Sequence, residues 1–362
     1  MIACRVCAIM FGLTFLTGSA CGMELELDAW QGEHVLYESS PSLQVCQGTH
    51  AWVDKFVPFV AGELGLDVGR IQHYRWLDES DYTCSPEIIG CTSGIQASSL
   101  RPFLLHELVH TILYSLDFPY QPFFGEGIAF AFDPWYGENL GIRYLVHKKG
   151  AEKLADPRPY MTLGRQDLSY PLAGSFVMFL LARHDPAKFL TFLRELGTSR
   201  DMNIIEGAFR AAYGLELDDE AESFMTGVPC TEQSFGPGLY DCTSPEVPWT
   251  GDAWSFHDVM DCASETVAGG VGPERAWSSI RSVTLEVPAT GFYQFSVKSD
   301  SNRIGVMLGP CSSCPWENSD VVVPSPGSKI AELEAGTHFV RIQAPSDETL
   351  NFEFSLRPAA LP

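Results

Sequence analysis

The chain has 362 residues, of which 45% are apolar and 19% are charged. This composition excludes a disordered or fibrous protein, and the length predicts two folded units in addition to a leader. Acidic residues outnumber basic ones by 46 to 23, which gives a net charge of −23. Phosphate backbones would be repelled by that charge, so no nucleic-acid partner is expected.

Residues 1–20 carry the features of a signal peptide. Arg5 precedes an apolar run that is about half as long as a bilayer-spanning helix requires, and small residues follow it. The ending "GSAC" resembles a bacterial lipobox, which implies a lipid anchor on Cys21, although Gly18 stands where leucine is usual. Ordinary cleavage after Ala20 is the alternative. We therefore expect an exported protein: a bacterial cell-envelope lipoprotein (outer membrane in a diderm), or otherwise a periplasmic or secreted one, with no other membrane contact.

Apart from Cys4 and Cys7 of the leader and Cys21, the chain has eight cysteines. An even number of cysteines in an exported chain predicts disulfides. Short spacing favours pairing Cys84 with Cys91 and Cys311 with Cys314. Cys46 would then reach one of the C-terminal cysteines and tie two domains together. "CSSC" also has the spacing of a redox motif or half a zinc site, but no second pair accompanies it beyond the leader, so a structural disulfide is favoured. The eight cysteines are Cys46, Cys84, Cys91, Cys230, Cys242, Cys262, Cys311 and Cys314.

Residues 21–45 are expected to be a linker long enough to cover a cleft, and residues 46–227 a mainly helical domain with a small N-terminal sheet. "THAWVDKFVPFVAGELGL" spaces its apolar residues as a helix does and closes with Gly65. "RIQHYRWL" and "IIGCTSGI" read as strands. Two helices are also predicted in "IIEGAFRAAYG" and "DDEAESFMTG". The other helices are expected at about 101–115, 123–132, 171–184 and 186–196.

The helix at 101–115 contains His-Glu-x-x-His, within "LLHELVHTIL". One helical turn separates His106 from His110, so both imidazoles reach the same ion. Glu107 is rotated about 100° around the helix and approaches that ion from its flank without ligating it. This is the geometry of a hydrolytic zinc site. Because chance produces the motif in roughly one such chain in a hundred, further evidence is needed.

A catalytic zinc needs a third protein ligand and an open position for water. A histidine six residues after His110 would fall on Leu116, so that arrangement fails. Asp117 and Asp133 are aspartate candidates, but the Gly-Thr-x-x-x-x-x-Tyr-Gly signature of the aspzincins is missing. Glu126, in "FFGEGIAFAF", lies on an apolar helix where an unpaired carboxylate would be costly to bury. We therefore select Glu126.

Residues 95–226 contain "HELVH", "GEGIA" and "YPLAGSFVMFLL". On these three stretches they resemble the gluzincins, zinc metallopeptidases of the thermolysin and aminopeptidase N type. The resemblance implies a zincin-like domain in which Glu107 is the general base and Tyr170 steadies the oxyanion. It departs from thermolysin at Phe130, where that enzyme has an aspartate, and lacks the Gly-x-Met-x-Asn exopeptidase segment. The implied zinc ligands are His106, His110 and Glu126.

Each site residue also has a structural alternative. The two motif histidines would then be core residues without metal, Glu126 would satisfy backbone donors at a helix start, and Tyr170 would be a wall residue. Surface positions without a ligand role are expected for Asp117, His147 and His184.

Residues 228–362 begin with a segment rich in proline, glycine and cysteine and continue as short alternating runs. These runs predict an all-β, jelly-roll-like sandwich of six to eight strands. "VPATGFYQFSV" and "LEAGTHFVRIQA" resemble the bacterial pre-peptidase C-terminal domain, which implies a role in targeting or substrate contact. Its aspartates do not alternate as in a calcium loop, so they are expected to be solvated. They are Asp252, Asp258, Asp300 and Asp320.

The sequence therefore predicts an α+β chain that acts as an exported metallopeptidase on a peptide or protein substrate, with Zn²⁺ as its cofactor. One alternative is an inactive, peptidase-like binding or scaffold lipoprotein at the cell surface. Another is a zinc hydrolase of a non-peptide amide, because the same activated water serves either bond. Metal content and chelator-sensitive cleavage separate the first two. Substrate preference and oligomeric state stay open.

Overall fold

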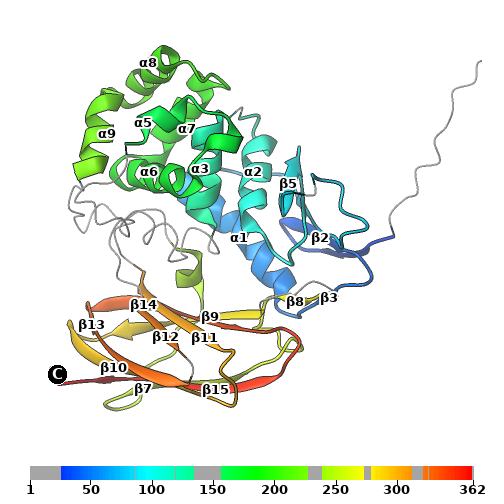
Figure 1. Ribbon diagram of the computed structural model, residues 1–362, viewed down its shortest axis with the longest axis vertical. Helices are drawn as coiled ribbons and strands as arrows, with labels where there is room; N and C mark the ends of the chain where they lie inside the picture. Colours follow the sequence, from blue (N-terminus) through cyan, green and yellow to red (C-terminus); the bar gives the residue numbers. More distant parts are fainter. Residues whose placement is uncertain are drawn as a thin grey trace, which may run out of the picture.

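The computed structural model describes residues 26–85, 87–118, 120–133, 156–226, 239–272, 279–311, 321–324 and 326–360. These residues form a mixed α+β chain with a mainly helical unit and a β-rich C-terminal unit (Figure 1). No helix within the described ranges is long and apolar enough to cross a bilayer. Several predictions fall outside them: the leader with Cys21, the boundary at 227–228, and those on His147, Cys230, Cys314 and Asp320.

A five-stranded sheet of order β1-β2-β4-β6-β5 belongs to the N-terminal unit. The three middle strands run parallel, and both edge strands are antiparallel to their neighbours. Residues 28–45, expected as a linker, instead supply β1, β2 and a short strand β3. Val35 and Tyr37 of β2 are buried, and the residues between and after them, Leu36 and Glu38, are only partly buried, as expected of a strand with one face in the core. The sheet strands are β1 (Asp28–Gln31), β2 (Val35–Ser39), β4 (Gln72–Trp76), β5 (Gly90–Ser93) and β6 (Gln96–Ser99).

The helices confirm the predicted helical half, with boundaries shifted by a few residues. Among the described residues, the α-helices and 3-10 helices are α1 (Thr49–Leu64), α2 (Leu105–Ser115), α3 (Pro122–Phe132), α5 (Arg158–Met161), η1 (Arg165–Asp167), α6 (Tyr170–Arg183), α7 (Pro186–Leu196), α8 (Met202–Tyr213), α9 (Leu217–Thr226) and η2 (Tyr240–Thr243).

Helix α2 is the central element of this unit, and every one of its residues except Tyr114 is buried. It packs against α1, α3 and strands β5 and β6. The loop leading into α2 is fixed by the sheet, because the hydroxyl of Tyr37 donates to the carbonyl of Pro102 at 2.6 Å and that of Tyr74 to the carbonyl of Arg101 at 3.0 Å. The helix that carries the histidine pair is therefore held at a defined place against the sheet.

Helices α3 and α6 pack closely side by side. Gly127 of α3 permits this approach, because a Cβ at that position would lie 2.7 Å from Cγ2 of Val177 and 2.8 Å from the carbonyl oxygen of Ala173. The "GEGIA" stretch thus uses its second glycine for helix packing.

The C-terminal unit consists mainly of two four-stranded antiparallel sheets that share one apolar core, as the sequence pattern predicted. Their orders are β13-β10-β15-β7 and β12-β11-β14-β9, so neither sheet closes into a barrel. Asp258 is not simply solvated, because it forms an ion pair with Arg281, which lies on the other sheet. Asp252 is exposed, and Asp300 accepts a hydrogen bond from Asn351. The strands are β7 (Trp254–Met260), β9 (Ser279–Val287), β10 (Gly291–Ser299), β11 (Gly305–Pro310), β12 (Val321–Pro324), β13 (Gly327–Leu333), β14 (Gly336–Ala344) and β15 (Leu350–Pro358).

The two units are joined by covalent and backbone contacts far from each other in sequence. Strand β3 (Gln44–Val45) pairs with β8 (Gly270–Val271), and the disulfide Cys46–Cys262 lies next to this pair. The hydroxyl of Thr49 donates to the carbonyl of Gly269 at 2.6 Å and accepts from its amide at 2.8 Å. The predicted link from Cys46 to the C-terminal cysteines is thus confirmed.

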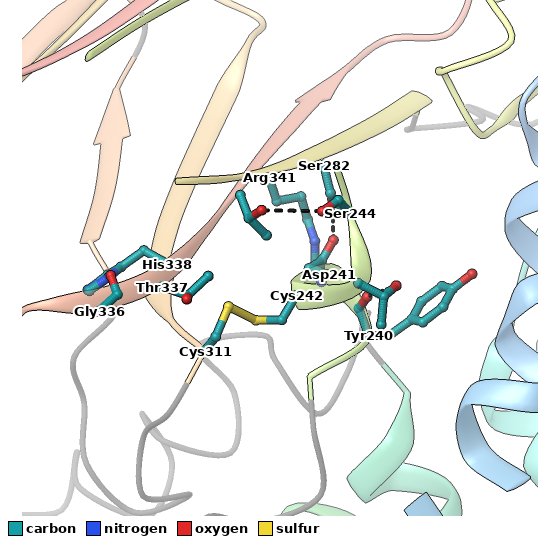
Figure 2. Close-up of a disulfide and its surroundings, with 12 residues drawn as sticks. Tyr240, Asp241, Cys242, Ser244, Ser282, Cys311, Gly336, Thr337, His338 and Arg341 are labelled. Carbon is teal, nitrogen blue, oxygen red and sulfur yellow. Dashed lines mark hydrogen bonds and ion pairs between the residues drawn. A yellow bond between two sulfur atoms is a disulfide. The ribbon is translucent and has the colours of Figure 1, made fainter. Parts of the chain in front are cut away.

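The short helix η2 adds a second connection between the units (Figure 2). Tyr240 points toward the helices, where it packs on Trp52 and Phe56 of α1. The next residue, Asp241, turns the other way and forms a buried ion pair with Arg341 of β14. Consecutive residues therefore anchor η2 in both units.

Two disulfides test the pairing predicted from short spacing. Cys84–Cys91 is present, so that prediction is confirmed. The pairing of Cys311 with Cys314 is wrong, because Cys311 bonds to Cys242. Helix η2 packs against β14 and β9, which brings Cys242 to the end of β11 across 69 residues of sequence. Proximity in the fold, and not in the sequence, decides this pair.

Candidate metal centre

Helices α2 and α3 bring three potential metal ligands together. The Nε2 atoms of His106 and His110 lie 3.2 Å apart. Oε2 of Glu126 lies 3.0 Å from the first of these nitrogens and 3.2 Å from the second. All three residues are buried. The third ligand selected from the sequence is therefore the carboxylate that meets the histidine pair.

The spacing of these three atoms fits a small metal ion. Ligands bound tetrahedrally at about 2.0–2.1 Å lie roughly 3.3–3.4 Å from one another, and the observed triangle has edges of 3.0, 3.2 and 3.2 Å. Two imidazole nitrogens and one carboxylate oxygen are also a donor set that transition metals accept. The group can hold a metal ion and would leave one position open.

Glu126 does not serve as the cap of its helix. That role belongs to Gln121, whose side chain accepts a hydrogen bond from the amide of Phe124 at 3.2 Å, while Pro122 occupies the first helical turn. Glu126 lies one turn further on, with only 4% of its side chain exposed. The alternative of a helix-start carboxylate therefore does not describe this residue.

Glu126 and His106 shift each other's pKa in opposite directions. Burial raises the pKa of Glu126, but the two imidazoles outweigh it and hold the pKa well below its usual range. Burial lowers the pKa of His106, whereas the hydrogen bond to Glu126 and the carboxylates of Glu107 and Asp133 raise it, and the net shift is upward. The site thus combines a carboxylate with two imidazoles, and none of the three side chains is more than 10% exposed.

Glu107 lies beside the triangle, in the first turn of α2. The hydroxyl of Thr92 in β5 donates to Oε2 of Glu107 at 2.6 Å. Gly90 of the same strand leaves room for it, because a Cβ there would lie 3.0 Å from Cγ of Glu107 and 3.2 Å from its Oε1. Edge strand β5 therefore passes directly next to this carboxylate and fixes one of its oxygens.

Tyr170 begins helix α6, and its ring centroid lies 6.2 Å from that of His106. Burial, together with the charge of Glu126, raises the pKa of its phenol to about 12. The hydroxyl therefore stays protonated at neutral pH and is able to donate a hydrogen bond. The structure thus places Tyr170 next to the candidate centre.

Two further residues at the centre were not predicted. Nε of Arg165 lies 2.8 Å from Oε1 of Glu126, the oxygen that faces away from the histidines. Its guanidinium also donates to the hydroxyl of Tyr120 at 2.5 Å. The ring of Tyr120 stacks on that of His110, with centroids 5.1 Å apart and planes 14° apart. Arg165 carried no sequence signal, because it begins the short 3-10 helix η1, which has no motif around it.

The other candidates do not join the triangle. Asp117 is exposed, as expected. Asp133 is buried at the end of α3 and acts on His106 through its charge. His184 is not a free surface group, because its side chain is only 12% exposed and its Nε2 lies 3.3 Å from the buried carboxylate of Glu220.

No protein-family model matches the chain, and no curated protein matches it. Among solved structures it is similar to the pre-peptidase C-terminal domain of a collagenase from Bacillus anthracis, at 9% identity and a TM-score of 0.24, over 32% of this chain and 94% of that chain. It is also similar to PliG of Aeromonas hydrophila, a periplasmic inhibitor of g-type lysozyme, at 9% identity and a TM-score of 0.22, over 32% of this chain and 96% of that one.

Proposed function

We propose that the chain is a zinc-dependent metallopeptidase of the gluzincin type. The observation that carries the proposal is the buried triangle of His106, His110 and Glu126 with Glu107 beside it on the same helix. Three protein ligands leave the fourth position of a tetrahedral ion open for water, which is typical of catalytic zinc, whereas structural zinc has four protein ligands. Zn²⁺ suits the mixture of imidazole and carboxylate donors.

The chemistry divides among the surrounding side chains. Zinc, when bound, supplies a Lewis acid that lowers the pKa of water and polarises a carbonyl. Glu107 is placed to take a proton from the attacking water and to pass it to the leaving amine. Thr92 orients that carboxylate through the 2.6 Å hydrogen bond. Tyr170 is the proposed hydrogen-bond donor to the oxyanion that develops on the substrate.

A peptide is favoured over other amides by strand β5. Among the described residues this strand pairs only with β6, so it is an edge strand of the kind to which an extended backbone can add. A peptide that adds to such an edge forms regular main-chain hydrogen bonds. Because Gly90 and Thr92 of β5 contact Glu107, a peptide bound there would run past the general base. A small non-peptide amide would gain nothing from this edge.

Digestion of a mixed peptide library, with and without a chelator, tests the proposal. We expect cleavage that the chelator abolishes and added zinc restores. Glu107→Gln should lose cleavage while retaining one zinc per chain, whereas Glu126→Ala should lose zinc. Absence of both metal and cleavage in the wild type would refute the peptidase and favour a scaffold protein. Zinc binding with turnover of only non-peptide amides would favour the other hydrolase.

The cellular location is a separate proposal. The three disulfides of the described chain fit an oxidising, extracytoplasmic compartment. We propose that Cys21 is lipidated after export and anchors the protein in the cell envelope. Fractionation of cells that express Cys21→Ser tests this, because the variant should leave the membrane fraction. Unchanged membrane association of the variant would refute the lipid anchor.

A further inference from the structure

We propose that Arg165 and Tyr120 act as positioning residues that hold Glu126 as a one-oxygen metal ligand and thereby set the affinity of the centre. The inference rests on the proposed metal centre, and it concerns two residues with no role in the motif. These two side chains are called the Arg165–Tyr120 bracket below.

The carboxylate of Glu126 is divided between two partners. Its Oε2 faces both histidine nitrogens at 3.0 and 3.2 Å, whereas its Oε1 lies 2.8 Å from Nε of Arg165. A carboxylate whose second oxygen is engaged by a guanidinium does not rotate that oxygen toward the metal without losing a charge-assisted hydrogen bond. The bracket therefore favours binding through Oε2 alone and leaves the fourth position to water.

Tyr120 ties the guanidinium to the second ligand as well. Its hydroxyl accepts from Arg165 at 2.5 Å, and its ring stacks on the imidazole of His110. The bracket thus touches two of the three ligands from outside. Outer partners of this kind fix the orientation of metal ligands, and their loss typically costs about 10–100-fold in metal affinity.

The sequence provides space for this arrangement at Gly125. A Cβ on that residue would lie 2.0 Å from Cδ2 and 2.5 Å from Cγ of the Tyr120 ring. Any other residue would push the ring away from His110 and from Arg165. The first glycine of "FFGEGIA" therefore serves the bracket, whereas the second serves the packing of α3 on α6.

The test measures zinc affinity of the metal-free protein by competition with a chromogenic chelator, and the absorption spectrum of the Co²⁺-loaded protein. Arg165→Gln should weaken zinc binding about 10–100-fold and reduce the intensity of the visible Co²⁺ bands, as a two-oxygen Glu126 raises the coordination number. Arg165→Lys should bind zinc more tightly than Arg165→Gln but less tightly than the wild type. Lysine keeps the positive charge but lacks the planar guanidinium with its several donors. Tyr120→Phe, which retains the stacking, should have a smaller effect than Arg165→Gln.

Arg158→Gln is the matched control, because Arg158 pairs with Asp156 and Asp218 and not with a proposed ligand. It should leave affinity and spectrum unchanged. An Arg165→Gln protein that keeps both the wild-type affinity within about twofold and the wild-type spectrum would overturn the inference, as would an equal loss in the control. These readouts need no turnover, so a wild type that binds zinc without cleaving peptides refutes only the proposed function. A wild type that binds no zinc overturns both.

Discussion

Replacing Thr92 by valine is the sharpest test of how the general base is held. The change keeps the shape of the side chain and removes the hydroxyl that donates to Oε2 of Glu107 at 2.6 Å. Thr92 lies on β5 and Glu107 on α2, so the contact joins two separate elements. Glu107 is only 8% exposed, which limits the replacement of the lost partner by bulk water.

The size of the effect follows from the strength of that hydrogen bond. A hydrogen bond to a charged group contributes about 1.5–3 kcal/mol. If its loss is expressed in the transition state, where Glu107 moves the proton, kcat should fall between about 10-fold and about 160-fold. KM and the dissociation constant for zinc should change by less than about threefold, because Thr92 touches no member of the proposed ligand set.

Steady-state kinetics on the best peptide from the library, with zinc titrations of the same preparations, measure these quantities. Thr111→Val is the matched control, because Thr111 is also buried and lies on α2, but its hydroxyl donates only to the carbonyl of Leu108. The control should keep wild-type kcat. A Thr92→Val protein with kcat within about twofold of wild type would refute the role assigned to this hydrogen bond.

Three further predictions concern stability. Replacing Cys46 and Cys262 by serine should lower the free energy of unfolding by about 2–5 kcal/mol, because the disulfide joins positions 216 residues apart. Denaturant unfolding measures this free energy, and an unchanged midpoint would contradict the prediction. Gly127→Ala should lower the free energy of unfolding by about 1–3 kcal/mol, because the added methyl group overlaps with α6. A thermal melt with no drop in Tm would argue against the close packing of α3 on α6. Burial raises the pKa of Glu220, but His184, whose Nε2 lies 3.3 Å from the carboxylate, and the guanidinium of Arg183 outweigh it, so the pKa lies below its usual 4.5. This carboxylate therefore stabilises the fold above about pH 4.5, and the contribution is lost as the pH falls through the lower folded pKa. Glu220→Gln should lower Tm at pH 7 and have little effect in strong acid, whereas a difference that is constant with pH would be inconsistent with this sign.

Local periodicity was sufficient to predict much of the fold. Helical spacing predicted α2 and the common side of His106 and His110, because residues four apart on a helix are neighbours whatever surrounds them. The cost of burying an unpaired carboxylate singled out Glu126 among the candidate ligands. Alternation and turn residues predicted the β-rich C-terminal unit, and a separation of seven residues predicted Cys84–Cys91.

The tertiary structure alone decided which distant residues surround the centre. Thr92 comes from an edge strand and Arg165 from the short 3-10 helix η1, and no spacing relates either of them to the motif. The same is true of Cys242–Cys311, which depends on where η2 packs. Periodicity reports the physics of one element, whereas these contacts depend on how separate elements pack. Helix α2 could therefore be predicted from the sequence, whereas the residues that hold Glu107 and Glu126 in place could be identified only from the folded structure.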